Sequence, residues 1–268
     1  MSVGAALAAA VRELAAAGCD TPRLDAEILL AAARGSDRSR LIIDRDAELE
    51  PAERRRFAEM RARRAAREPV AYILGRRHFR RLTLAVDSRV LIPRPETELL
   101  VEIALGLPAG ASVIDVGTGS GAIALAVKDE RPDLRVRAAD ISGEALAVAR
   151  DNAARLGLDV AFAQADLLDG EPADAVLANL PYVAVGAPLA PEITLYEPPG
   201  ALFAGADGLD LVRRLVTAVS GPSVALLALE IGPEQAVEVE RLVWGAGFAE
   251  VGVRHDLAGL DRVVVGRA

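Results

Sequence analysis

A glycine-rich turn, Gly117-Thr-Gly-Ser-Gly121, directly follows a short apolar run at residues 112–116 and restricts the folds that this chain can adopt. The apolar run has the length of one buried strand. Glycines let the backbone turn tightly and approach a ligand that a Cβ would exclude. In parallel α/β sheets, ligands bind beyond the carboxyl ends of the strands, so the turn is a candidate binding loop. The alternative is a plain turn that joins a strand to a helix.

Strand and helix patterns alternate on both sides of this turn, from residue 95 to the last residues. Strands are expected over residues 112–116, 135–140, 160–164, 173–178, 224–231, 248–256 and 261–265. Helices are expected over residues 96–107, 120–130, 142–157 and 209–220, with another beginning at Pro233. This alternation predicts an α/β fold with a Rossmann-like, doubly wound, mostly parallel sheet. The short connection before the final strand predicts that this strand runs antiparallel.

Residues 1–75 have helical spacing and predict a small separate domain. Its helices are expected from Val3 to Ala17, from Pro22 (capped by Thr21) to Gly35, from Pro51 to before Pro69, and for one turn over residues 69–74. Between residues 79 and 92 the apolar period changes to two, which predicts a β-hairpin with its turn near Asp87-Ser88. The expected organisation is a helical domain (1–75), a hairpin linker (76–94) and a sheet domain (95–268).

Composition limits the classes of protein and site. The chain is 52% apolar and 26% charged, and no apolar run is long enough to span a membrane. No signal peptide is recognisable, so a cytoplasmic location is expected. The single cysteine, Cys19, excludes an intramolecular disulfide and is expected to be a buried apolar residue. His78 and His255 are the only histidines and are far apart in the sequence, so no metal site is expected.

The net charge of −8 argues against a general nucleic-acid binder, but the charge is unevenly distributed. Between Arg54 and Arg81 the sequence has 11 arginines and only two acidic residues. This basic stretch is either a solvated helix face or a contact for an acidic partner, or for RNA bound to that partner. The protein is expected to be a monomer without direct contact to nucleic acid.

The spacing of the glycines favours one class of cofactor. Gly121 follows Gly119 by two residues, whereas the dinucleotide fingerprint places its third glycine three residues after the second. The loop, with Thr118 and Ser120, therefore suits the zwitterionic end of S-adenosylmethionine (SAM). Asp140 ends the next strand and could accept hydrogen bonds from both ribose hydroxyls, unless it only caps a helix together with Ser142.

The third expected strand is followed by Asp166 and Leu167. The carboxylate of Asp166 could accept a hydrogen bond from the exocyclic amine of adenine, with Leu167 beside the ring. Aspartates at strand ends are also common turn residues, which is the simpler interpretation.

The string Asn179-Leu-Pro-Tyr182 follows the fourth expected strand and is interpreted as the reaction centre. Acceptors at the two N–H groups of a planar amide or amine can direct its lone pair toward the methyl group. The side-chain oxygen of Asn179 and the carbonyl of Leu180 would supply these acceptors, and Pro181 restricts Leu180 to extended backbone. Tyr182 would offer a flat face to the substrate group. Orientation and electrostatics are the main catalytic effects in this hypothesis.

With these motifs the chain resembles the release factor glutamine methyltransferase family (PrmC, or HemK). The likeness covers nearly the whole chain, including the helical first domain. Its most specific part is the segment around Arg94. The segments that carry it are Pro69-Val-Ala-Tyr-Ile-Leu-Gly75, Leu91-Ile-Pro-Arg-Pro-Glu-Thr-Glu98, the glycine loop and Asn179–Tyr182.

The resemblance implies N5-methylation of the glutamine in the Gly-Gly-Gln motif of bacterial peptide chain release factors. SAM would be the donor and S-adenosylhomocysteine the product. The implied SAM site comprises Gly117–Gly121, Asp140, Leu167 and Asn179, and the implied glutamine site comprises Asn179–Tyr182.

Two further features come with this resemblance. The segment Glu197-Pro-Pro-Gly-Ala-Leu-Phe203 matches the family, and Arg94 and Glu197 are assigned to the substrate site on that basis. The long loop 183–199 is expected to shape the surface for the protein substrate, unless it is a plain crossover. The family usually has proline where this chain has Leu180, so the reaction rate is in question more than the reaction type.

Two other functions remain open at this point. Asn-Leu-Pro-Tyr also resembles the string of ribosomal-RNA adenine dimethyltransferases, so adenine-N6 methylation of RNA or DNA is one alternative. Those enzymes usually have a basic substrate face and a domain after the sheet, whereas this chain is acidic and has its extra domain in front. The second alternative is a module that binds SAM without catalysis, which the intact Asn179 and Tyr182 disfavour.

Overall fold

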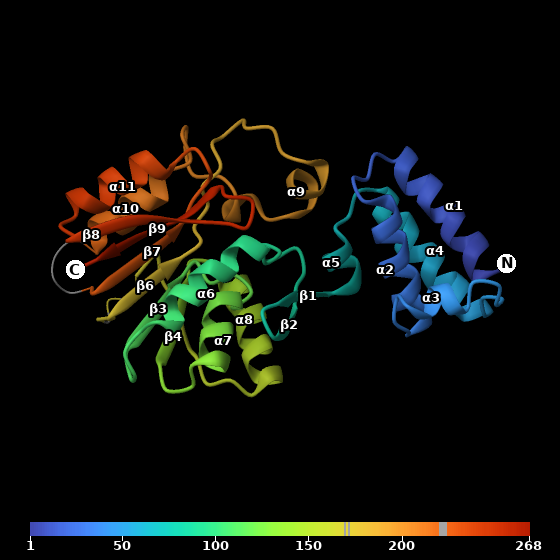
Figure 1. Ribbon diagram of the computed structural model, residues 1–268, viewed down its shortest axis with the longest axis horizontal. Coiled ribbons are helices and arrows are strands. Elements are labelled where there is room, and N and C mark those ends of the chain that lie inside the picture. Colours follow the sequence, from blue (N-terminus) through green and yellow to red (C-terminus); the bar gives the residue numbers. More distant parts are fainter. Residues whose placement is uncertain (169, 171, 220–223) are drawn as a thin grey trace. The chain divides into compact units, whose positions relative to one another are not determined.

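The computed structural model describes residues 1–168, 170, 172–219 and 224–268. The chain folds into two compact units (Figure 1). The first comprises Met1–Arg76 together with Leu189–Tyr196, and the second comprises Arg77–Pro188 together with Glu197–Ala268. A short segment from the second half of the sequence thus belongs to the unit built by the first residues.

The first unit is helical, as its apolar spacing predicts. Its elements are α1 (Val3–Ala16), α2 (Pro22–Arg34), α3 (Arg40–Ile43), α4 (Pro51–Ala65), α5 (Val70–Leu74) and α9 (Pro191–Tyr196). Leu14, Leu29 and Phe57 are buried in its core, and Gly35 ends α2 in the left-handed conformation with φ of 63°. The hydroxyl of Thr21 donates to the Asp25 carboxylate over 2.9 Å, so the expected side-chain cap of α2 is not formed.

The second unit contains a sheet with the order β5-β4-β3-β6-β7-β9-β8. Its strands are β3 (Ser112–Val116), β4 (Arg135–Asp140), β5 (Ala161–Gln164), β6 (Ala175–Ala178), β7 (Leu226–Glu230), β8 (Glu250–His255) and β9 (Asp261–Arg267). The strands from β5 to β7 are mutually parallel, whereas β9 is antiparallel to both of its neighbours, β7 and β8. The predicted doubly wound sheet with an antiparallel last strand is confirmed.

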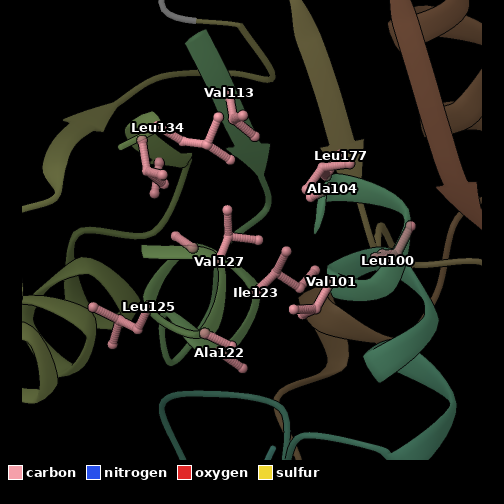
Figure 2. Packing of buried hydrophobic residues seen from close by; sticks show 14 of the residues in the cluster. Leu100, Val101, Ala104, Val113, Ala122, Ile123, Leu125, Val127, Leu134 and Leu177 are labelled. Carbon is pink, nitrogen blue, oxygen red and sulfur yellow. The ribbon is translucent and has the colours of Figure 1, made fainter. Parts of the chain in front are cut away.

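Helices cover both faces of this sheet. Alternate residues of a strand point to opposite faces, so apolar side chains on both faces are buried against helices. Val113 and Leu177 face α6 (Glu98–Leu105) and α7 (Ala122–Glu130), where Figure 2 shows them among buried side chains of both helices. Ile114 and Val176 face the other side, in a second core with residues of α10 (Asp210–Ala218) and α11 (Ala236–Gly245). The helix α8 (Gly143–Leu156) lies between β4 and β5 in the chain.

The expected hairpin is present but its turn was placed wrongly. The strands are β1 (Arg76–Phe79) and β2 (Leu82–Ala85), so the turn lies at Arg80-Arg81 and not at Asp87-Ser88. Arg80 has a φ of 52°, and its N–H donates to Glu98 over 3.1 Å. Its guanidinium donates to both oxygens of Glu130 over 2.8 and 2.9 Å. Glu98 and Glu130 are distant from Arg80 in sequence, so the spacing of apolar residues alone could not locate the turn.

Other elements differ in detail from the expected ones. The helix expected from residue 96 begins as a 3-10 turn, η1 (Pro95–Thr97), before α6. The loop expected over residues 183–199 contains α9, and a second 3-10 turn, η2 (Pro199–Ala201), begins where that loop ends. The expected end of a helix at Ser220 lies outside the described residues. Over the described ranges, no helix combines the length and the apolar character that crossing a membrane requires.

Candidate active site

A cavity of about 420 Å³ lies in the second unit, at the carboxyl ends of the parallel strands. Its wall includes Asp140, which ends β4, and residues that follow β3, β5 and β6, namely Gly117, Asp166 and Asn179. The chain order reverses between β3 and β6, which are neighbours in the sheet. Such a switch point is where open α/β sheets bind ligands. The two sequence motifs singled out above therefore line the same cavity.

The glycine loop contributes its first residues to the cavity wall but not its last. Gly117 and Gly119 line the cavity and have φ values of 73° and 56°, in the left-handed region that favours glycine. Gly121 also has a positive φ, of 85°, but a Cβ there would lie 2.9 Å from Leu125 and 3.3 Å from Ala149. Gly121 thus allows close packing of the loop against helices, and its predicted place in the cofactor site is not seen in the cavity wall.

Thr118 and Ser120 also line the cavity, and both are buried. The hydroxyl of Thr118 donates to Oδ2 of Asp115 over 2.6 Å, and the N–H of Ala124 donates to the same oxygen over 3.2 Å. Asp115 is fully buried, and this burial raises the pKa of its carboxyl group to about 7 despite these hydrogen bonds. Asp115 therefore connects the glycine loop, through Thr118, to the first turn of α7, through Ala124.

Asp140 lies where β4 ends, as predicted, and lines the cavity. Its Oδ2 accepts a hydrogen bond of 2.9 Å from the N–H of Gly119, and its Oδ1 accepts one of 2.8 Å from the N–H of Ser142. Each carboxylate oxygen can accept a further hydrogen bond, so Asp140 can orient the glycine loop and still bind a diol.

Asp166 and Leu167 line the same cavity on the side of β5. The carboxylate of Asp166 already accepts a hydrogen bond of 2.7 Å from Arg214, and both side chains are about half exposed. Leu167 has a φ of 72°, an uncommon conformation for a residue with a branched side chain. Strain of this kind is concentrated at binding sites, where the surrounding structure holds it.

Asn179, Leu180 and Pro181 line the cavity after β6. The Nδ2 group of Asn179 donates to the hydroxyl oxygen of Thr97 over 3.0 Å. Leu180 is buried in the second core, and its side chain lies against Gly117, where a Cβ would come within 3.0 Å of it. The glycine loop and the Asn179 string are therefore in direct contact.

Tyr182, the last residue of the string, is not part of the cavity wall. Its hydroxyl donates to Glu230 over 3.3 Å, and its carbonyl accepts a hydrogen bond of 2.9 Å from Nε2 of Gln235. Burial raises the pKa of the Tyr182 phenol above its ordinary value, and the nearby Glu230 carboxylate adds to this effect. The structure thus shows Tyr182 anchored at both ends, beside the cavity.

Arg94 and Glu197 also lie outside the cavity wall and bind each other. Glu197 is buried, one of its oxygens accepts from Arg94, and the other accepts a hydrogen bond of 3.1 Å from the N–H of Ile92. Both carboxylate oxygens of Glu197 therefore accept hydrogen bonds. These bonds anchor the segment that continues into Pro198 and Gly200, two residues that line the cavity. A direct substrate contact for Arg94 or Glu197 stays a prediction.

Two site residues were missed in the sequence. Thr97 lies within one of the motifs noted above but had no role assigned, and Glu230 was only the end of an expected strand. Both are buried, and Thr97 lines the cavity. The position of Glu230 in the sheet could have identified it. Glu230 ends β7, which is the neighbour of β6, and Asn179 immediately follows β6. Polar residues at the carboxyl ends of adjacent parallel strands come together.

The cavity suits a nucleoside that carries an amino-acid tail. Its volume is within the range of sites for small molecules, and apolar residues such as Ile141 and Leu167 form part of its wall. The carboxylate of Asp140 offers acceptors for a diol, and the glycine loop allows close approach to the backbone. Asn179 adds a polar group at the same cavity, so a second, planar group could be bound beside the first.

The comparisons with protein-family models and with related proteins agree with each other. Residues 5–75 match the family model "PrmC N-terminal domain", and residues 95–193 match "Methyltransferase small domain". The chain is 44% identical to the release factor glutamine methyltransferase of Cereibacter sphaeroides, covering 100% of this chain and 99% of that protein. It is 45% identical to the protein of the same name from Burkholderia pseudomallei, with 91% of each chain covered.

Solved structures share the fold at low sequence identity. The hMettl16 catalytic domain in complex with a MAT2A 3′UTR hairpin superposes with a TM-score of 0.60 and 16% identity, covering 78% of this chain and 82% of that one. A methyltransferase from Pyrococcus furiosus superposes with a TM-score of 0.52 and 14% identity, covering 69% of this chain and 87% of that one.

Proposed function

This chain belongs to the release factor glutamine methyltransferase family, and we propose that it methylates the glutamine of the Gly-Gly-Gln motif in bacterial peptide chain release factors. The methyl group passes from SAM to the side-chain amide nitrogen, N5, and S-adenosylhomocysteine is the product. The observation that carries the proposal is that the glycine loop and the Asn179 string line one cavity.

The walls of the cavity divide into a cofactor part and an acceptor part. In the cofactor part, Gly117 and Gly119 admit the amino-acid end of SAM, and Asp140 accepts from the ribose hydroxyls. Asp166 and Leu167 bind the adenine. When bound, SAM supplies an electrophilic methyl group on a sulfonium.

In the acceptor part, Oδ1 of Asn179 and the carbonyl of Leu180 accept hydrogen bonds from the two N–H groups of the substrate amide. This holds both N–H bonds out of line with the methyl group and directs the nitrogen lone pair toward it. The new bond forms between nitrogen and carbon as the bond between sulfur and carbon breaks, and the methylated nitrogen releases one proton to water. Orientation of the amide is the main contribution of these residues.

The helical first unit is proposed to bind the release factor, because the candidate SAM residues all belong to the second unit. A substrate from the translation apparatus would place the protein in the cytoplasm. Direct binding of nucleic acid is not needed for this reaction, and a monomer would suffice.

Mass spectrometry of a release factor after incubation with SAM tests the proposal. The expected result is a gain of one methyl group on the glutamine of the Gly-Gly-Gln motif. Asn179→Ala should lower turnover by about 10²-fold, by analogy with the loss of a preorganised polar contact, while SAM affinity changes only several-fold. Ribosomal RNA incubated in parallel tests adenine methylation. Methyl transfer to RNA but not to the factor would contradict the proposal.

A further inference from the structure

The side-chain amide of Gln235 joins three segments of the second unit. Gln235 is the residue before α11, and its Oε1 accepts a hydrogen bond of 2.9 Å from the N–H of Gly232. Its Nε2 donates to the carbonyl of Tyr182 over 2.9 Å and to the carbonyl of Asp207 over 3.2 Å. Gln235 is not part of the cavity wall, and the reaction described above gives it no role.

The partners of this amide allow only one orientation of it. A backbone N–H group only donates hydrogen bonds, and a backbone carbonyl only accepts them. Rotation of the amide by half a turn would place its NH₂ group against the N–H of Gly232 and its oxygen against two carbonyls. A planar group with an acceptor on one side and two N–H donors on the other is found only in glutamine and asparagine, and asparagine is shorter by one methylene. Glutamine therefore fits the three contacts better than any other side chain.

The contact with Tyr182 is made at the end of the Asn179 string. The residue after Tyr182 is also held by backbone hydrogen bonds. The N–H of Val183 donates to the carbonyl of Leu202 over 2.9 Å, and its carbonyl accepts from the N–H of Ala204 over 3.0 Å. The other end of the string immediately follows β6, so the string is held at both ends.

The contact with Asp207 connects the string to α10. Asp207 and Gly208 lie in the turn before this helix, whose Leu211 lines the cavity. Gly208 has a φ of 77°, and a Cβ there would overlap the carbonyl oxygen of Tyr182. The turn therefore packs directly against the end of the string, and one side-chain amide bonds to both.

We propose that Gln235 is a positioning residue for methyl transfer, because it fixes the carbonyl of Tyr182 at the end of the Asn179 string. The inference rests on the proposed function, since it concerns the two acceptors that orient the substrate amide. The carbonyls of Leu180 and Tyr182 are only two residues apart, and the ring of Pro181 between them restricts rotation. A shift of Tyr182 would therefore move the Leu180 carbonyl as well. Displacement of a reacting group by about 1 Å can lower a rate by about 100-fold.

The test compares Gln235→Glu and Gln235→Met with the wild type at pH 8, using the full chain, SAM and a release factor. Glutamate has the shape of glutamine, but its ionised carboxylate cannot donate and would face two carbonyl oxygens. Methionine has a similar length and donates no hydrogen bond. Both variants should lower kcat by roughly 10- to 100-fold, while KM for the factor and the dissociation constant of SAM stay within about threefold of the wild type.

Val239→Ala is the matched control for a loss of stability. Val239 lies one turn further along α11, is fully buried in the second core and takes no part through its side chain in the hydrogen bonds of Gln235. Its truncation leaves a cavity, so the urea midpoint should fall, but kcat should stay within about twofold of the wild type. This comparison separates a displaced reaction centre from a weakened fold.

Wild-type kcat in either variant of Gln235 would overturn the inference. An equal loss of kcat in Val239→Ala would also overturn it, as would a rise in KM or in the SAM dissociation constant as large as the fall in kcat. Calorimetry with SAM checks that each variant is folded, and if Gln235→Glu does not fold, Gln235→Met decides alone. A wild type that binds SAM without methylating the factor would instead overturn the proposed function, and this inference with it.

Discussion

The carboxylate of Glu192 accepts a hydrogen bond of 2.8 Å from the guanidinium of Arg64, across 128 residues of sequence. Arg67 donates to the same carboxylate, and Arg64 also donates to Asp25 over 2.7 Å. Although burial opposes it, these arginines lower the pKa of Glu192 to about 2. This ion cluster binds α9 into the helical unit.

The cluster changes the interpretation of the basic stretch between Arg54 and Arg81. Arg64 is 5% exposed, so it is neither part of a solvated face nor available to a partner. Both interpretations of the basic stretch are therefore wrong for this residue. Arg61 is paired with Glu13 over 2.9 Å. Within α4, the exposed Arg55 is a better choice than Arg64 for testing contact with the release factor.

Arg64→Ala should destabilise the first unit by about 3–5 kcal/mol, because it leaves the buried Asp25 carboxylate without its cationic partner and removes one of the two arginines that bind Glu192. Hydrogen exchange in α1, α2 and α4 is the suitable measurement, since the only tryptophan, Trp244, lies in the second unit. Arg23→Ala is the control: Arg23 pairs with Glu27 over 2.9 Å but is largely exposed, so the change should be under about 1 kcal/mol. Equal protection in both variants would contradict the importance of the cluster.

Much of the sheet and of the cavity could be predicted from the sequence because both depend on local patterns. The alternation of short strand patterns with helical ones gave β3 and β4 with their observed ends, and residues at or just after strand ends form part of the cavity wall. Contacts between distant segments could not be predicted in this way. The ion cluster that holds α9 and the hydrogen bond that Asn179 donates to Thr97 each join residues far apart in the chain, and no period in the sequence encodes them.

Asp140→Ala should weaken SAM binding by about 1.5–3 kcal/mol, because charge-assisted hydrogen bonds to the ribose are lost. Part of this loss will come from the glycine loop, since Asp140 also accepts from the N–H of Gly119. Calorimetry with SAM measures this loss, and adenine alone is the control: it has neither the ribose nor the amino-acid end, so it should bind almost equally to the wild type and the variant. An unchanged dissociation constant for SAM would remove Asp140 from the site.

Leu180→Pro restores the family's more common string and tests what the side chain of Leu180 does. The carbonyl is kept, so turnover should be equal to that of the wild type or modestly higher. Leu180 is buried against Gly117 and the second core, so the shorter ring should cost about 1–3 kcal/mol of unfolding free energy. Urea unfolding followed by Trp244 fluorescence measures this cost. A loss of turnover in a folded variant would show that the leucine side chain or its N–H takes part in the reaction.

Asp115 makes the stability of the second unit depend on pH in an unusual direction. Its pKa is about 7 in the folded protein against an ordinary value of 3.8, and burial is the main cause. Between about pH 4 and 7 the unfolded chain has therefore lost a proton that the folded protein keeps. Stability contributed by this group must fall as pH rises through that window and stay constant above it. Glu230, with a pKa raised to about 7, acts in the same direction.

Asp115→Asn should make the urea midpoint of the second unit less dependent on pH between about 4 and 7, because asparagine does not ionise but can still accept from Thr118 and Ala124. Trp244 fluorescence again reports on this unit. Asp133→Asn is the matched control: Arg131 lowers the pKa of exposed Asp133 to about 2, so its removal should matter only below about pH 4. An Asp115→Asn protein with the wild-type pH dependence would show that Asp115 is ionised in the folded state, and Glu230 would then remain as the main source of the slope.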